Sequence, residues 1–131
     1  MVRTPVVTVL LAVLLIGCAS GLHPPVVSVQ ATPDAQGVQR VDVELHSFYF
    51  KPNRIVVHSG RPVELTIRNR SIIVPHSFTI ADSALAVDVS KWGVGAHRVR
   101  FTAPGPGEYR FFCHVDSHGK KGMTGTLVVV T

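Results

Sequence analysis

Residues Gly107 to Gly125 read GEYRFFCHVDSHGKKGMTG, and this stretch carries a distinctive set of side chains. A strand-like run ends at Cys113, His118 follows five residues later, and Met123 follows five residues after that. A thiol, an imidazole and a thioether thus share one short loop. Soft and borderline transition metals, copper first among them, prefer such donors.

The alternation in the run before this loop predicts which way its side chains point. Phe111 and Cys113 share one face of the expected strand, because successive side chains of a strand point to opposite faces. We therefore expect Cys113 to point inward and His114 outward. A buried free cysteine can also serve as a small apolar side chain without a metal. The two further donors favour a metal site, and Gly119 and Gly122 would let the loop turn back tightly.

A fourth donor has to come from elsewhere in the chain, which contains seven histidines. His76 stands in IIVPHSFTI, directly after Pro75 and before a strand-like run, so the proline should restrict the backbone that carries the ring. His97 has inward parity, and we expect it to be a packed core histidine. The other candidates lie in an expected tether, on a polar strand face, in a turn or on an outer face: His23, His46, His58 and His114.

The rest of the chain is a series of short strand-like runs. Apolar and polar residues alternate over residues 41–45, 62–69 and 97–101, and shorter apolar runs cover residues 55–57, 77–80 and 125–130. Turn residues separate these runs, as in KPN and PGPG. Seven or eight short strands at about ten-residue spacing are typical of an all-β sandwich or barrel. Residues 81–95 are less regular and should hold a brief helix or a long loop.

The first 17 residues predict a signal peptide. Arg3 precedes an apolar run that ends at Ile16, and this run is shorter than the about 20 residues of a membrane-spanning helix. Export is therefore favoured over a membrane anchor helix. Leu15-Ile16-Gly17-Cys18 resembles the lipobox of bacterial lipoproteins, which implies lipidation of Cys18 and leaves Cys113 as a free thiol. A disulfide between Cys18 and Cys113 is the alternative.

The remaining sequence divides into a linker and one folded unit. Residues 18–40 contain three prolines and two glycines without a sustained hydrophobic period, and they predict a flexible tether. Residues 41–131 predict a single domain with a lean core, which a metal crosslink would help. The net charge of +5 is modest and is not gathered in the basic run of a nucleic-acid surface. We expect a monomer that does not bind nucleic acid and that meets the membrane through its lipid.

The order and spacing of the four donors resemble the type 1 copper site of the cupredoxins. Cys113 follows His76 by 37 residues, and PVELTIRN and GMTGTL extend the resemblance over residues 41–131. It implies a Greek-key β-sandwich that binds one copper ion. His76, Cys113 and His118 would be the equatorial ligands and Met123 the weak axial ligand. The implied function is one-electron transfer in the bacterial cell envelope, in the periplasm or at the cell surface, without enzymatic activity.

Some features depart from this pattern or leave alternatives open. Ser77 stands where many cupredoxins carry an asparagine that ties two ligand loops together. The Cys-x3-Cys of the dinuclear copper site in oxidase subunit II and the His-x-His pairs of multicopper oxidases are absent.

The alternative functions are copper delivery to an oxidase, an enzyme completed at a subunit interface, and a zinc site. Met123 as the single methionine beyond the signal peptide disfavours delivery, because delivery proteins usually expose methionine or histidine clusters.

The resemblance also implies a surface for redox partners of the cytochrome or oxidase type. In the family, the second histidine ligand lies near an apolar surface that serves as the electron port. Val94, Pro75 and Gly119 could supply such a surface here. The nearby Lys120 and Lys121 would favour a partner with an acidic docking surface.

Overall fold

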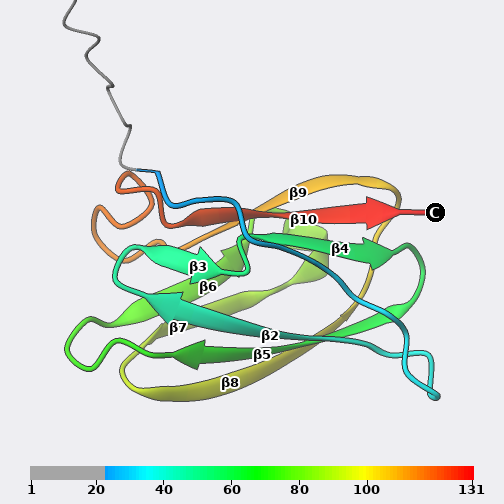
Figure 1. Ribbon diagram of the computed structural model, residues 1–131, viewed down its shortest axis with the longest axis horizontal. Coiled ribbons are helices and arrows are strands. Elements are labelled where there is room, and N and C mark those ends of the chain that lie inside the picture. Colours follow the sequence, from blue (N-terminus) through cyan, green and yellow to red (C-terminus); the bar gives the residue numbers. More distant parts are fainter. Residues whose placement is uncertain (1–22) are drawn as a thin grey trace, which may run out of the picture.

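The computed structural model describes residues 23–131, which form two β-sheets packed against each other (Figure 1). The strand order is β1-β4-β10-β9-β6-β7 in the larger sheet and β3-β2-β5-β8 in the smaller one. The predicted all-β sandwich is confirmed, with more strands than expected. The strands are Ser28–Gln30 (β1), Gln39–His46 (β2), Tyr49–Lys51 (β3), Arg54–His58 (β4), Pro62–Asn69 (β5), His76–Ile80 (β6), Asp88–Trp92 (β7), Gly95–Thr102 (β8), Gly107–Phe112 (β9) and Thr124–Val130 (β10).

Part of the expected tether belongs to the fold. β1 pairs in parallel with β4, and β2 begins at Gln39, so residues 28–40 are not a free linker. The Asn53 side chain holds the residues just before β1, because it accepts a hydrogen bond from the Val27 N–H (2.7 Å) and donates one to the Pro25 carbonyl (3.0 Å). These contacts join residues that are far apart in the sequence, so no local sequence pattern predicts them.

The irregular segment 81–95 contains both a turn and a strand. Ser83–Leu85 is a short 3-10 helix, as the expectation of a brief helix allowed, and β7 follows it as the outermost strand of the larger sheet. The predicted signal peptide and Cys18 lie outside the described residues. Within residues 23–131, no helix is long and apolar enough to cross a membrane.

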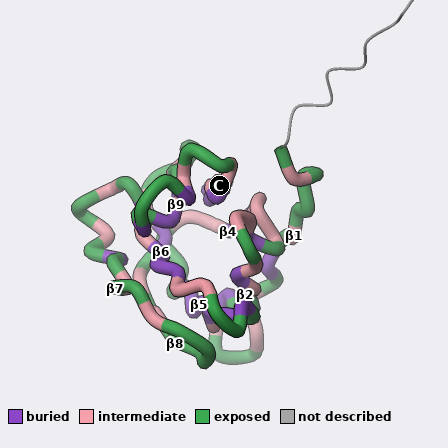
Figure 2. The backbone as a smooth tube through the Cα atoms, turned by 90° about the vertical axis from the view of Figure 1, so that its left-hand side faces the viewer, coloured by how far each residue is buried: buried purple, intermediate pink, exposed green. Residues whose placement is uncertain are grey.

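The core lies between the two sheets and is built on three phenylalanine rings. The buried stretches follow the strands that face this interior (Figure 2). Phe50 packs edge-on against Phe78 and Phe111, at 5.7 and 5.2 Å between ring centroids. Position 125 has room only for glycine, because a Cβ atom there would lie 2.2 Å from the Phe111 ring. The position of Phe111, two residues before Cys113, is therefore fixed by close packing.

His97 is not a core residue, contrary to the prediction from its parity. Its side chain is exposed and meets the Trp92 ring edge-on at 4.6 Å between centroids. β8 is an edge strand of the smaller sheet, and its first residues extend past the core, so parity alone does not bury a side chain there. Val99 and Phe101, further along the same face, do pack against the core.

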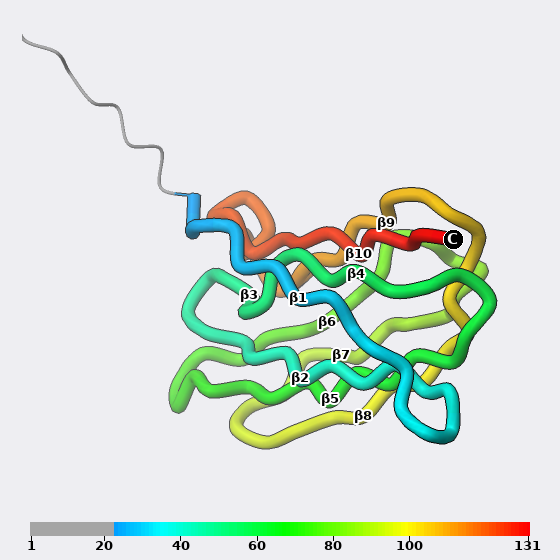
Figure 3. The backbone as a smooth tube through the Cα atoms, turned by 45° about the vertical axis from the view of Figure 1, so that its right-hand side comes forward, coloured from blue at the N-terminus to red at the C-terminus, as the bar shows by residue number. Residues whose placement is uncertain are grey.

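Four connections lie together at one end of the sandwich. The strand pairings place the β2–β3, β5–β6, β7–β8 and β9–β10 connections at this end. Figures 1 and 3 show the β2–β3, β5–β6 and β9–β10 loops side by side there. The described chain also begins at this end (Figure 3). Three of the four predicted metal donors lie on the β9–β10 connection, and His76 lies at the start of β6.

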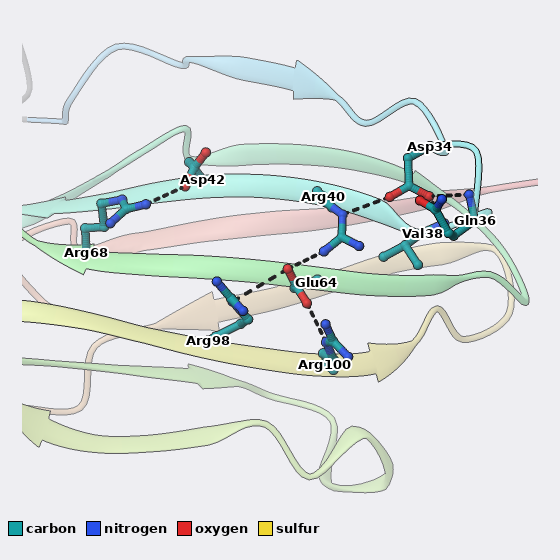
Figure 4. A network of polar contacts seen from close by, with 9 residues as sticks. All are labelled: Asp34, Gln36, Val38, Arg40, Asp42, Glu64, Arg68, Arg98 and Arg100. Atoms are coloured by element: carbon teal, nitrogen blue, oxygen red, sulfur yellow. Dashed lines mark hydrogen bonds and ion pairs between the residues drawn. The ribbon is translucent and has the colours of Figure 1, made fainter.

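The outer face of the smaller sheet carries an arginine cluster around one carboxylate (Figure 4). Glu64 is 5 % exposed and accepts hydrogen bonds from Arg40 and Arg100, with Arg98 3.6 Å away. Burial by itself would raise the pKa of Glu64, but the hydrogen bonds from Arg100 and Arg40 outweigh it and leave this pKa below its ordinary value. The cluster ties β2, β5 and β8 together.

The lowered pKa of Glu64 predicts how stability depends on pH. A carboxyl group whose folded pKa lies below its unfolded value stabilises the fold above about pH 4.3, and this contribution is lost as pH falls through the folded pKa. We expect Glu64→Gln to lower the free energy of unfolding at pH 7, and the deficit to shrink below about pH 4. Denaturant titrations of both proteins at several pH values measure this. The exposed Glu108, 3.6 Å from Arg54, is the control position, and a Glu108→Gln effect as large as that of Glu64→Gln would contradict the prediction.

Candidate metal centre

Three predicted donors from distant parts of the chain converge at the end of the sandwich described above. The ligand atoms of His76, Cys113 and His118 all lie within 4.8 Å of one another. The Cys113 Sγ is 3.6 Å from Nδ1 of His118 and 4.0 Å from Nδ1 of His76. All three side chains are buried, with His118 the most exposed of them at 7 %.

The pairing of β6 with β9 accounts for this convergence. The two strands run antiparallel with Thr79 opposite Phe112, which sets the start of β6 beside the residue that follows β9. His76 is the first residue of β6, and Cys113 directly follows β9. Two residues 37 positions apart in the sequence therefore lie next to each other. His76 and Cys113 thus stand at adjoining ends of two paired strands.

Met123 lies in the same buried layer. Its side chain is fully buried, its N–H donates to the His118 carbonyl (3.1 Å), and its carbonyl accepts from the Cys113 N–H (3.2 Å). The two loop glycines allow this tight return. Gly122 has a φ of 96°, in the left-handed region, and a Cβ on Gly119 would lie 3.2 Å from the Cys113 carbonyl oxygen.

A serine that the sequence analysis did not single out orients the His76 ring. The Ser71 hydroxyl lies 3.0 Å from Nε2 of His76, which leaves Nδ1 facing the sulfur. The Ser71 N–H donates to the Asn69 side chain, whose amide donates in turn to the carbonyls of Val74 and Trp92. A polar partner on the far nitrogen fixes both tautomer and orientation, as is usual for metal-binding histidines. The residue type and spacing of Ser71 carried no signal that could have indicated this role.

Ser77 links the two strands at the sulfur. Its backbone N–H lies 3.4 Å and its hydroxyl 3.5 Å from Cys113 Sγ, and the hydroxyl also accepts from the His114 N–H at 2.9 Å. A serine therefore makes the tie between ligand segments that an asparagine would make in many cupredoxins.

His114 points away from the cluster, as its strand parity predicted. Its side chain is 46 % exposed, and Nδ1 lies 3.1 Å from the Thr79 hydroxyl and 3.9 Å from Asp88. The residue next to the buried thiol is therefore on the outer surface of the larger sheet.

Both clustered imidazoles are neutral at neutral pH. Burial, followed by the nearby His118 and His46, lowers the pKa of His76 to about 4. Burial and the charge of Lys121 lower the pKa of His118, although Asp116 opposes this shift. A metal ion needs deprotonated imidazoles, so both histidines are already in the form that binds an ion.

This set of donors fits one copper ion. Two neutral imidazoles, a thiol with two hydrogen-bond donors and a buried thioether form the set that copper accepts in both oxidation states. Zinc prefers four harder or thiolate ligands, and the thioether makes it the poorer match. Among residues 23–131 this is the one group of three histidine, cysteine or acidic ligands close enough to share an ion.

Solved structures with a similar fold include copper proteins. Auracyanin from Roseiflexus castenholzii superposes with a TM-score of 0.64 and 20 % identity over 70 % of this chain and 97 % of its own. Reduced rusticyanin gives a TM-score of 0.62 and 20 % identity, with 88 % and 89 % of the two chains covered. The metal-binding domain of the Cu(I)-exporting ATPase CopA from Streptococcus pneumoniae D39 gives 0.65 and 21 %, over 82 % and 100 %. These likenesses establish the fold.

Sequence comparisons identify the family of this chain. Two relatives, both cytochrome c oxidase subunit 2 from Thermus thermophilus, are 33 % identical over 84 residues, or 63 % of this chain. The match spans 59 % of one relative and 48 % of the other. The model of the cupredoxin-like domain matches residues 7–129, which is nearly the whole chain. The protein therefore belongs to the cupredoxin-like family.

Proposed function

We propose that this protein is a one-electron carrier with a single type 1 copper ion, and that it works in the bacterial cell envelope. The observation that carries the proposal is the closed cluster of His76, Cys113 and His118 with the buried Met123. Four protein donors would surround the ion, and all four are buried. Such a site is suited to electron transfer.

His76, Cys113 and His118 would hold the ion, with Met123 as the weak fourth ligand. Bound copper would supply the change between Cu(I) and Cu(II). The chain would supply a site that does not rearrange. Ser71 holds the first imidazole, Ser77 holds the sulfur, and the backbone bonds of Met123 close the loop. Small rearrangement between oxidation states is what fast electron exchange requires.

We infer that the protein is exported and tethered to a membrane by a lipidated Cys18, with a membrane-bound oxidase or a cytochrome as partner. The similarity to two oxidase subunits supports an oxidase-type partner.

Apolar side chains on the loops at the copper end offer a contact surface. Ile72 is 86 %, Ile73 89 % and Val94 68 % exposed. Val94 was expected there, whereas the two isoleucines were not singled out in the sequence.

Copper delivery to an oxidase is the second candidate function, and the same oxidase relatives favour it. The burial of all four donors opposes it, because ready transfer of an ion needs accessible ligands. Transfer of Cu(I) to a weak chelator distinguishes the two functions. A delivery protein would surrender the ion quickly, and a carrier would retain it.

Absorption spectroscopy tests the carrier function. The Cu(II)-loaded protein should show an intense thiolate-to-copper band at about 600 nm together with a narrow copper hyperfine splitting. Cys113→Ser should abolish the band, because it removes the thiolate, while His114→Ala should retain it, because that ring faces outward. A colourless wild-type protein would refute the proposal.

Ser77 should raise the reduction potential, because hydrogen bonds to the sulfur withdraw charge from it and favour Cu(I). We expect Ser77→Ala to lower the potential while the colour persists, since the backbone N–H still reaches the sulfur. Ser77→Thr keeps the hydroxyl and should restore the wild-type value. Cyclic voltammetry of the three proteins measures this, and an unchanged potential in Ser77→Ala would show that the hydroxyl does not act on the sulfur.

A further inference from the structure

The His118 ring is not bare at the surface, although it is the ligand expected to serve as the electron port. It is 7 % exposed, and the Phe48 ring stands edge-on against it at 4.9 Å between centroids. Phe48 comes from the β2–β3 connection, which is remote in sequence from the metal loop. A molecule that approaches His118 from this side therefore meets the Phe48 ring first.

Phe48 occupies this place at a conformational cost. Its φ is 72°, in the left-handed region that bulky side chains rarely adopt and where glycine or asparagine would be less strained. A strained residue persists where the surrounding structure fixes it, and such residues gather at functional sites. Two side chains contact the Phe48 ring: the His118 ring, and the Lys121 ammonium at 4.1 Å from the ring centroid.

An open hollow of about 810 Å³ lies over Phe48, and its charged lining is entirely basic. Phe48 and Tyr49 supply apolar walls, and Lys120 and Lys121 supply two ammonium groups. No carboxylate among the described residues lines the hollow or pairs with either lysine. An aromatic floor with two unneutralised cations matches a partner that presents acidic side chains beside an apolar surface.

We propose that this hollow is the docking site for an acidic segment of the redox partner. The partner's carboxylates pair with Lys120 and Lys121, and its apolar surface packs against Phe48 and Tyr49. The partner then lies one aromatic ring away from the ligand His118. This inference rests on the proposed carrier function, because it supposes that a redox partner docks at the copper end.

The test is amide NMR of the ¹⁵N-labelled full chain, in its metal-free and Cu(I)-loaded forms, titrated with a hexaglutamate peptide at low salt. We expect the peptide to shift the amides of residues 47–49 and 119–122. Lys120→Glu with Lys121→Glu should weaken binding by about tenfold or more. The control pair Lys51→Glu with Lys91→Glu makes the same change in net charge at exposed lysines outside the hollow and should leave binding within about twofold.

Three results would overturn the proposal. The shifts could map to another face, or both charge-reversal pairs could weaken peptide binding equally, which would reflect net charge alone. Alternatively, reversal at Lys120 and Lys121 could abolish binding to phosphatidylglycerol vesicles while the peptide still binds, which would assign the hollow to a lipid headgroup. Because the metal-free form is also titrated, a docking failure is distinguishable from a copper site that lacks the blue absorption.

Discussion

The contact on which the metal centre depends is the link from the start of β6 to the end of β9 through Ser77. Strand pairing sets the register, and Ser77 then directs its N–H and hydroxyl at the Cys113 sulfur while it accepts the His114 N–H. A one-residue slip would turn His76 away from the sulfur, because successive side chains face opposite sides. The stacking of Phe78 on Phe111, at 5.2 Å between ring centroids, opposes such a slip from inside the core.

The parts of the site that could be predicted from the sequence are those with a local pattern. Alternation along β9 correctly separated the buried Cys113 from the exposed His114. Soft donors at short spacing indicated a metal loop, and proline before His76 indicated a stiff position. The all-β sandwich followed in the same way, from short alternating runs separated by turn residues. Each of these signals depends on neighbours in the sequence, which is why it is visible without a structure.

The parts that could not be predicted depend on contacts between distant segments. β1 is held by its pairing with the distant β4, and the edge position of β8 leaves His97 exposed, so neither outcome follows from composition or parity. Ser71 and Phe48 meet the two imidazoles through tertiary packing alone. The structure thus adds what holds each ligand and what covers it. These two features decide how rigid the site is and from which side a partner can approach it.

The central claim is that one copper ion sits in a rigid site formed by a thiolate and two imidazoles. X-ray absorption spectroscopy of the full chain, loaded with one equivalent of copper and measured in both oxidation states, tests it most directly. We expect one short copper–sulfur contact and two copper–nitrogen contacts that change little between Cu(II) and Cu(I). Loss of the sulfur or of a nitrogen on reduction, or a second copper ion nearby, would contradict it.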